Sequence, residues 1–338
     1  MNKTIHCASV VLLLSVACAF AQAGQNANPY IGCWALTIPG GGAGWLGVTQ
    51  EDGYLDGSIL WGGGSVVPVD CVFTTDGVLY VLRLERVERR NAAREVVRTQ
   101  MFPELIEATV DGDALKLKRT TVRRNGEGVN EEEFTGKRIP PLPPAPDLAQ
   151  VKYGDPIVLF NGTSLEGWTL TNENQTNGWS PQEGALVNNP VQPQGRRRLS
   201  YGNLRTIAEF EDFNLKLEVN VPRNGNSGVY LRGIYEVQVS DSYDRPLDPH
   251  NMGGIYSRIK PTVNAEKPAG QWQTMDITLL DRHVTVKLNG TAIIDNQPLL
   301  GCTGGALWSD EFKPGPIYLQ GDHTAVSYRN IVLTPVVK

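Results

Sequence analysis

Apolar and polar side chains alternate with a period of two along residues 226–241. Because successive side chains of a strand point to opposite faces, this alternation predicts one uninterrupted strand with two different faces. The apolar face holds Val229, Leu231, Gly233, Tyr235, Val237 and Val239. The other face holds Tyr230, Arg232, Ile234, Glu236, Gln238 and Ser240. A guanidinium, a carboxylate and an amide in one row suit sugar hydroxyls, so we interpret this face as a candidate site, although a merely solvated strand would also carry a polar face.

The same period marks further strands in the second half of the chain. Along residues 213–221 every second residue is apolar, which indicates a half-buried antiparallel strand. Two apolar runs, 284–288 and 291–294, flank Asn289-Gly290, the dipeptide that most strongly indicates a β-hairpin. Further apolar runs lie at 275–279, 317–320 and 326–333. We expect these strands to pack as two sheets.

The first half of the chain shows short apolar runs separated by frequent turns. Between Tyr30 and Arg138, Gly- and Asp-rich turns recur roughly every ten residues, which predicts an antiparallel meander or small barrel. Gly32-Cys-Trp34 resembles the Gly-x-Trp opening of lipocalin-type meanders, which would imply a ligand for this domain. Residues 83–100 are charged and rich in helix formers, and they predict either a short helix or an extended excursion.

A proline-rich segment divides the chain. Residues 139–146 read Ile-Pro-Pro-Leu-Pro-Pro-Ala-Pro, and proline has no amide hydrogen to donate to a ladder or a helix. We therefore expect an all-β domain over residues 29–138, an extended, semi-rigid linker over 139–156 and a second all-β domain over 157–338. The 36 glycines and 22 prolines also favour turn-rich β structure over helices.

The N-terminus resembles a secretory signal peptide over residues 1–23. Lys3 precedes an apolar run at 10–17, and two small-x-small cleavage sites end at Ala21 and Ala23. We therefore expect export to the periplasm or the extracellular space. Ser15-Val-Ala-Cys18 comes close to a lipoprotein cleavage box, which makes a lipid anchor the lesser alternative. No later segment reaches the roughly 18 apolar residues of a membrane-spanning helix.

Charge and cysteine spacing exclude several function classes. A net charge of −5 provides no basic surface for nucleic acid. There is no Cys-x-x-Cys, and the histidines are widely separated, so nothing indicates zinc. The sequence has neither a Gly-x-Gly-x-x-Gly turn after a strand nor a βαβ rhythm, so nothing indicates a redox cofactor. A Cys33–Cys71 bridge is plausible in an exported protein, and Cys302 would then be a buried free thiol.

Several motifs in one order carry a resemblance to a known family. These are Asn226-Ser-Gly228 running into Tyr235-Glu-Val-Gln238, Leu159–Trp168, Gly254-Ile-Tyr256, Pro268–Trp272, Val286–Gly290, Gly315–His323 and Tyr328–Ile331. In their order and spacing, residues 157–336 resemble the 3-keto-disaccharide hydrolase domain family. The resemblance implies a concanavalin-like jelly-roll sandwich whose concave sheet holds a sugar.

The resemblance also implies site residues. His323 falls in the Leu-Gln-x-x-His run of the family, with Gln320 beside it, and imidazole exchanges protons near neutral pH. Tyr256 occupies the Gly-x-x-Tyr turn, and Trp272 is a candidate platform for a sugar face. The alternative for each aromatic residue is core packing, and for His323 a structural hydrogen bond at a strand end.

Glu236 is the best catalytic candidate by position, because it lies in the middle of the polar face. Asp241 lies five residues later and reaches the same face only if a β-bulge intervenes. The series Glu236-x-Gln238-x-x-Asp241 is similar to the Glu-x-Asp-x-x-Glu strand of jelly-roll glucanases, with Gln in the middle position. Ordinary retaining hydrolysis requires two suitably spaced carboxyl groups and is therefore in doubt.

The resemblance implies cleavage of glycosides that carry a ketone at C3. The ketone acidifies the C2 proton, so one base can drive β-elimination of the C1 oxygen, with hydrolysis as the alternative. We expect His323 or Glu236 as base, Arg232 and Gln238 as oxygen binders together with Tyr230, and Asp241 as an orienting or acid group.

A non-catalytic carbohydrate-binding module of laminin-G type is the rival function, and a structural envelope protein is a third. The expected partner is a glycoside or oligosaccharide, the oligomeric state stays open, and a structural calcium ion is the one metal that jelly rolls would suggest.

Overall fold

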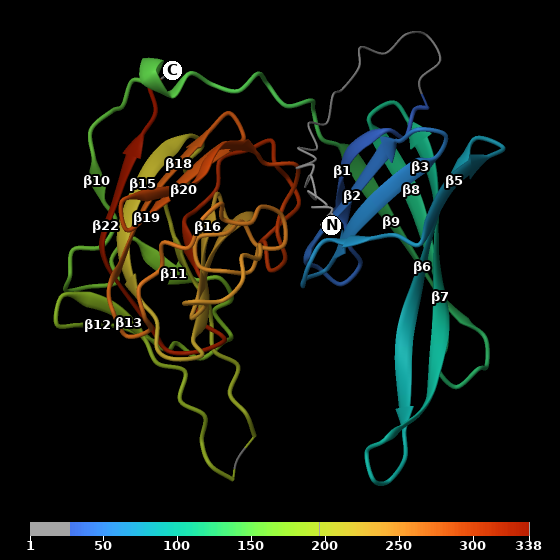
Figure 1. Ribbon diagram of the computed structural model, residues 1–338, viewed down its shortest axis with the longest axis horizontal. Helices are drawn as coiled ribbons and strands as arrows, with labels where there is room; N and C mark the ends of the chain where they lie inside the picture. Colours follow the sequence, from blue (N-terminus) through green and yellow to red (C-terminus); the bar gives the residue numbers. More distant parts are fainter. Residues whose placement is uncertain (1–27, 196, 338) are drawn as a thin grey trace, which may run out of the picture.

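The computed structural model describes residues 28–195 and 197–337, and the expected signal peptide lies outside this range. The described chain is almost entirely β-structure, with one short 3₁₀ helix, Leu148–Gln150. Figure 1 shows a curled sheet made by the first half of the chain beside a sandwich made by the second half. The predicted all-β fold class is therefore confirmed. Within residues 28–195 and 197–337, no helix is long and apolar enough to cross a membrane.

Residues 32–138 form a nine-stranded antiparallel sheet within the described part of the chain. Its order is β4-β3-β2-β1-β9-β8-β7-β6-β5, so the first and last parts of this segment meet at the β1–β9 pair. The strands are β1 (Gly32–Thr37), β2 (Ala43–Gln50), β3 (Leu55–Trp61), β4 (Val67–Pro68), β5 (Cys71–Thr75), β6 (Val78–Arg90), β7 (Val96–Asp111), β8 (Ala114–Val122) and β9 (Val129–Arg138). The predicted meander is thus a single curled sheet.

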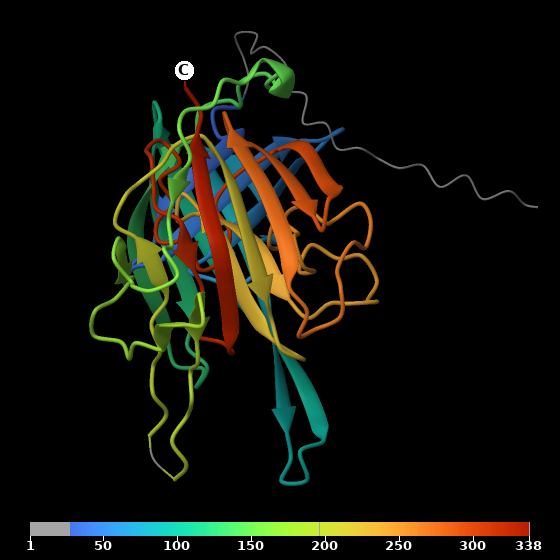
Figure 2. The same ribbon diagram turned by 90° about the vertical axis from the view of Figure 1, so that its left-hand side faces the viewer.

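The charged segment 83–100 is extended rather than helical. It forms the distal part of the β6–β7 hairpin, which projects beyond the other strands in both views (Figures 1 and 2). Cross-strand ion pairs such as Arg83–Glu104, at 3.3 Å, replace the helical contacts that its composition would also have allowed. Cys33 lies on β1 and Cys71 on the edge strand β5, where Cys71 is an exposed free thiol, so the suggested bridge is wrong. Cys302 is a buried free thiol, as expected.

The second half of the chain forms two antiparallel sheets that face each other. In the described residues the larger sheet runs β12-β13-β22-β15-β18-β19-β20, with β10 paired to β22. Its strands are β10 (Ile157–Val158), β12 (Trp179–Gln182), β13 (Ala185–Asn188), β15 (Phe213–Asn220), β18 (Gln273–Leu280), β19 (His283–Leu288), β20 (Thr291–Pro298) and β22 (Val326–Pro335). The smaller sheet, in order, contains β11 (Trp168–Leu170), β14 (Leu204–Thr206), β21 (Tyr318–Leu319), β16 (Asn226–Leu231) and β17 (Tyr235–Ser240).

Local sequence explains this architecture. In β15 each second residue from Phe213 onward is buried in the core between the sheets, as the alternation predicts. Asn289 and Gly290 both have positive φ, 51° and 83°, which allows the tight turn between β19 and β20. Residues 226–241, by contrast, are not one strand. They form a hairpin whose turn contains Arg232 and Gly233, with φ of 55° and 69°.

The core of the sandwich extends into the first half of the chain, which also has an apolar core of its own. Strands β1–β3 present Trp34 and Leu46 to the interior of the curled sheet, whereas Trp45 and Leu60 point the other way and join the core of the sandwich. The proline-rich segment runs between the halves at the top of Figure 1. Arg282 Nη2 of the sandwich donates to the carbonyls of Pro140 and Pro141 at 2.8 and 2.7 Å, so this segment is held against the sandwich.

Candidate active site

A cavity of about 320 Å³ opens at the smaller sheet of the sandwich. Its walls combine polar side chains of β16, β17 and the segment after β21 with backbone of two glycine pairs. The lining residues are Gly63, Gly64, Asn203, Asn226, Tyr230, Glu236, Tyr256, Gly304, Gly305, Tyr318, Gln320, Asp322 and His323. Both halves of the chain therefore contribute to the cavity.

The hairpin turn brings Tyr230 and Glu236 together. The two residues are direct cross-strand partners, as are Gly228 and Gln238, so their side chains share one face of the smaller sheet. A glycine is required opposite Gln238, because a Cβ on Gly228 would lie 2.3 Å from Glu236 Oε1. The alternation in the sequence also predicts Tyr230, Glu236 and Gln238 on one face, but as every second residue of a single strand. In the structure they share a face because the two strands of a hairpin pair.

Glu236 is buried, with 3% of its surface exposed, and burial raises its pKa to about 8. Its Oε2 lies 2.7 Å from Tyr230 Oη, which also lies 2.8 Å from the carbonyl oxygen of Gly304. The tyrosine has one proton, and a carbonyl can only accept a hydrogen bond. Both contacts are satisfied when Tyr230 donates to Gly304 and a protonated Glu236 donates to Tyr230. Hydrogen-bond accounting and the raised pKa thus agree on a neutral carboxyl group near pH 7.

Gln238 supports Glu236 from behind. With its amide nitrogen turned toward the acceptors, Nε2 lies 3.1 Å from Glu236 Oε1 and 3.1 Å from the carbonyl oxygen of Ser227. The Glu236 amide in turn donates to Thr303 Oγ1 at 2.9 Å. Gln238 is buried and does not line the cavity. We therefore correct its expected role from binding substrate to holding Glu236 in place.

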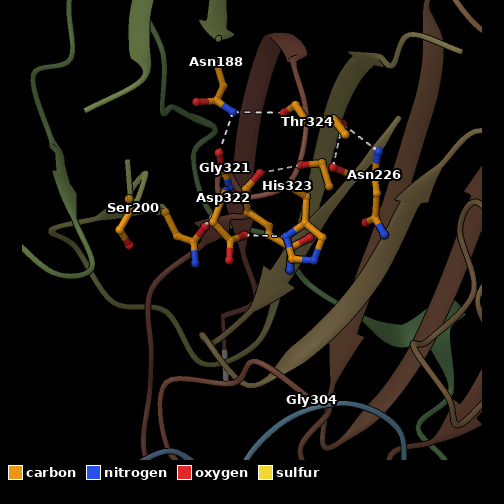
Figure 3. A network of polar contacts seen from close by, with 12 residues as sticks. Asn188, Ser200, Asn226, Gly304, Gly321, Asp322, His323 and Thr324 are labelled. Atoms are coloured by element: carbon orange, nitrogen blue, oxygen red, sulfur yellow. Dashed lines mark hydrogen bonds and ion pairs between the residues drawn. The ribbon is translucent and has the colours of Figure 1, made fainter. Parts of the chain in front are cut away.

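His323 and Asp322 form a hydrogen-bonded pair at the mouth of the cavity. His323 Nδ1 lies 2.7 Å from Asp322 Oδ1, and this bond raises the pKa of the imidazole above its usual value. Figure 3 shows the Asp322 carboxylate turned toward the ring. Asn203 Oδ1 accepts from the amide of Asp322 at 3.2 Å, which fixes the loop that carries the pair.

A network behind this loop ties it to both sheets. Asn188 Nδ2 donates to the carbonyl oxygens of Gly321 and Thr324 at 2.9 and 3.1 Å. The backbone amide of Asn226 donates to Thr324 Oγ1 at 2.8 Å (Figure 3). Because Asn188 lies on β13 and Asn226 on β16, the loop is held by both layers of the sandwich.

Two stacked tyrosines form the floor beside Glu236. The rings of Tyr230 and Tyr318 lie 4.1 Å apart at an angle of 11°, and Asn203 Nδ2 donates to Tyr318 Oη at 2.8 Å. Burial raises the pKa of both hydroxyls, so both remain protonated donors. A donor next to a neutral acid suits a substrate oxygen that gains negative charge.

Tyr256 and Gln320 also reach the cavity. Tyr256 packs at its rim with the His250 ring edge-on at 4.7 Å, and the Gln320 side-chain oxygen is buried with no hydrogen-bond partner among the described residues. Of the site residues expected from the sequence, the structure therefore places Tyr230, Glu236, Tyr256, Gln320 and His323 around one cavity.

Three expected site residues lie elsewhere, and each has a local reason. Arg232 sits in the hairpin turn rather than on a strand face, and its Nη2 donates to the Glu311 carbonyl at 2.8 Å. Asp241 Oδ2 accepts from the Asn224 amide at 2.8 Å across a turn, and no bulge interrupts the β16–β17 register. Trp272 lies next to β18, on the larger sheet, where the Arg329 guanidinium is 4.1 Å from its ring.

Sequence reasoning missed Asp322, Asn203, Tyr318 and the two glycines of the first half. Asp322 could have been found, because it directly precedes His323 in the matched motif. Asn203 and the Gly63–Gly64 pair come from other segments, and no local pattern links them to the motif. Among residues 28–195 and 197–337, no three His, Cys, Asp or Glu side chains are grouped to hold a metal ion, so we assign no calcium ligands.

Comparisons with known proteins find similarity in the second half of the chain, which contains most of the cavity residues. The model of a family described as the 3-keto-alpha-glucoside-1,2-lyase-like domain matches residues 155–334. A crystal structure described as a candidate glycosyl hydrolase from Parabacteroides distasonis has 30% identity and a TM-score of 0.44, and the match covers 58% of this chain and 93% of that one.

A second such structure from the same organism has 19% identity and a TM-score of 0.43, with 54% of this chain and 94% of that one covered. A carbohydrate-binding module from Bacillus subtilis has 14% identity and a TM-score of 0.34, with 52% and 98% covered. No protein with a curated description matched the chain.

Proposed function

The chain belongs to the 3-keto-alpha-glucoside-1,2-lyase-like family, whose model covers more than half of its residues, and on this premise we propose that it is an enzyme that cleaves 3-keto-glycosides by β-elimination. A carbohydrate-active protein is what the family match supports directly. The reaction, the ketone at C3 and export from the cell are our proposals.

Elimination needs a base, an acid and a donor for the ketone oxygen. The base removes the C2 proton, whose acidity comes from the neighbouring ketone, and negative charge develops on the C3 oxygen. The electron pair then forms the C1–C2 double bond as the C1–O bond breaks. The departing oxygen takes a proton from the acid, and no water is consumed. Positioned acid–base groups each contribute about 10²–10⁴-fold to such reactions.

The observation that carries this proposal is that a neutral buried carboxyl group and a histidine–aspartate pair border the same cavity. Glu236 holds a proton near pH 7, which fits the acid that serves the leaving oxygen. His323 is oriented by Asp322 through Nδ1, so Nε2 is the atom available to take the C2 proton. Tyr318, which accepts from Asn203, has its own proton to offer to the C3 oxygen.

The same geometry favours elimination over direct hydrolysis. A retaining hydrolase needs an ionised carboxylate as nucleophile next to its acid. In this cavity Glu236 holds a proton near pH 7, and Asp322 is hydrogen-bonded to His323, so neither carboxyl group is placed as a free nucleophile. Asp241, the second carboxylate that the sequence pattern suggested, follows β17 outside the cavity and accepts from the backbone amide of Asn224.

Isotope incorporation tests this mechanism. The full chain is incubated in heavy water with a 3-keto-α-glucoside and, separately, with the unoxidised parent, and the products are examined by mass spectrometry. We expect cleavage of the ketone alone, to an unsaturated sugar that has lost the C2 proton and is one water lighter than the hydrolysis product, and loss of this cleavage in His323→Ala. Tight binding of both sugars without cleavage would instead support the non-catalytic binding module, and cleavage of the parent would exclude the elimination.

A further inference from the structure

We propose that the first half of the chain forms a fixed wall of the substrate cavity, and that its Gly62–Gly64 turn limits the size of the glycoside that can enter. The family model begins at residue 155, so this wall lies outside the part of the chain that the family describes. The identity of the sugar in this inference depends on the proposed function, whereas the wall itself follows from contacts in the structure.

The turn between β3 and β4 reaches the cavity through backbone alone. Gly63 and Gly64 line it, and the three glycines of the turn have φ of 71°, 143° and 69°, which side chains rarely adopt. Facing them is Gly304, where a Cβ would lie only 1.9 Å from Gly64 O. The two backbones therefore touch at this seam, and any side chain on the turn would project into space that a substrate would use.

Gly304 also connects the wall to the proposed acid. Its carbonyl oxygen accepts from Tyr230 Oη at 2.8 Å, and its neighbour Thr303 accepts from the Glu236 amide through Oγ1 at 2.9 Å. One short segment thus touches Gly64 on one side and Glu236 on the other.

Hydrogen bonds fasten the turn to the sandwich. The amide of Val66 donates to Ser257 Oγ at 2.7 Å, and Ser65 Oγ lies 3.0 Å from His250 Nε2. His250 packs against Tyr256, which lines the cavity. The position of the turn is therefore coupled to the cavity rim.

Packing of Trp45 into the sandwich core holds the wall against the sandwich. The partly buried Arg258 guanidinium lies 4.4 Å from the Trp45 ring and donates to the Cys302 carbonyl, with Nε at 2.9 Å. Nearby, the Gly44 amide donates to Ser309 Oγ at 2.8 Å. Opening the seam would expose Trp45, a large apolar side chain that is buried in the closed arrangement, and its exposure to water is unfavourable.

The wall also offers groups that suit a sugar. Within residues 28–195 and 197–337, the backbone amides of Gly63 and Gly64 form no hydrogen bond, so neither donor is engaged by another group of the protein. At about 320 Å³ the cavity is near the lower end of the roughly 300–1,000 Å³ that is usual for ligand pockets. These features indicate a mono- or disaccharide glycoside as substrate rather than a polysaccharide chain.

A side chain added to the turn tests the wall. Asn tolerates positive φ, and no atom lies within 4 Å of a Cβ built at Gly64. We expect Gly64→Asn to lower kcat/KM for a 3-keto-disaccharide about tenfold or more relative to methyl 3-keto-α-glucoside. Gly126→Asn is the matched control, because Gly126 has φ of 83°, equally open surroundings and a place in the same half of the chain outside the cavity. It should change neither value.

Binding measurements separate this inference from the proposed function. The dissociation constants of methyl α-glucoside and an α-linked glucose disaccharide are measured by calorimetry on the same proteins. One outcome is that the wild type cleaves neither ketone, while Gly64→Asn selectively weakens binding of the disaccharide. The wall then stands and the proposed reaction fails. If the wild type cleaves both ketones and Gly64→Asn leaves their ratio unchanged, the reaction stands and the wall is refuted. Should Gly64→Asn not fold, Gly64→Ala, a smaller side chain at the same cavity-lining position, replaces it. Absence of binding and cleavage in the wild type refutes both proposals.

Discussion

Two tyrosines of the β16–β17 hairpin each pair with a buried glutamate, and the surroundings of the two pairs differ. Tyr230 Oη lies 2.7 Å from Glu236 Oε2, and Tyr235 Oη lies 2.7 Å from Glu311 Oε2. Both carboxyl groups are buried, with 3% and 5% of each residue exposed, and burial raises the pKa of both. Glu236 opens onto the cavity, whereas Glu311 lies outside it.

Positive charge distinguishes the two pairs. Arg258, Arg282 and Arg232 oppose the effect of burial on Glu311, and Arg282 Nη1 lies 3.9 Å from its Oε2. Among the described residues, no Lys or Arg forms an ion pair with Glu236. The comparison teaches that burial and a tyrosine partner are common to both pairs. Access to a cavity and the absence of a Lys or Arg partner distinguish Glu236, the proposed acid.

The largest expected effect is on turnover. Glu236→Gln removes the proton that serves the leaving oxygen and should lower kcat about 10²–10⁴-fold on a 3-keto-α-glucoside. Glu311→Gln, the matched change in the other pair, should leave kcat within a few-fold, because Glu311 does not line the cavity. Steady-state kinetics on folded variants, checked by circular dichroism, measure both. Equal losses in the two variants would contradict the division of roles.

The next effect concerns stability. Glu311→Ala removes the buried carboxylate that faces Arg282, Arg258 and Arg232, and breaking such a buried cluster costs about 3–5 kcal/mol of unfolding free energy. Urea unfolding measures this loss. Glu218→Ala is the control, because Glu218 pairs with Arg329 at 2.6 Å with both side chains partly exposed, and such pairs are worth about 1 kcal/mol or less. A loss at Glu311 no larger than at Glu218 would show that the cluster is not stabilising.

The smallest expected effect is a shift in pH dependence. In the wild type, kcat/KM should rise as His323 loses its proton, above the usual imidazole value of 6.5, and fall as Glu236 ionises near pH 8. Tyr230 stabilises ionised Glu236 by donating to it, so Tyr230→Phe should raise the pKa of Glu236 and move the falling limb to higher pH. We expect about a tenfold loss at the optimum. A falling limb that stays in place or moves to lower pH would remove Glu236 as the acid.

The sequence predicted those parts of the fold that depend on local pattern. The alternation in Phe213–Asn220 and the Asn289-Gly290 turn give correct strands and a correct hairpin. Motif order identified the family, and with it Glu236 and His323, which the structure places at one cavity.

What the sequence could not predict depends on long-range contacts. Arg232 was assigned to the polar face because strand parity continues through the turn, and Leu-Arg-Gly-Ile carries no strong hairpin signal. Its guanidinium finds its acceptors some 80 residues away, at Glu311 and Lys313. The contribution of Gly63 and Gly64 likewise requires knowing that two separate halves of the chain meet at Gly304.

The position of Trp45 and Leu60 within the core of the sandwich has a practical consequence. A polypeptide trimmed to residues 155–334 would retain every side chain of the proposed acid–base pair, yet it would present to water the apolar surface that Trp45 and Leu60 cover. We therefore expect such a fragment to aggregate. We therefore do not expect the start of the family match at residue 155 to be a boundary between independently soluble units.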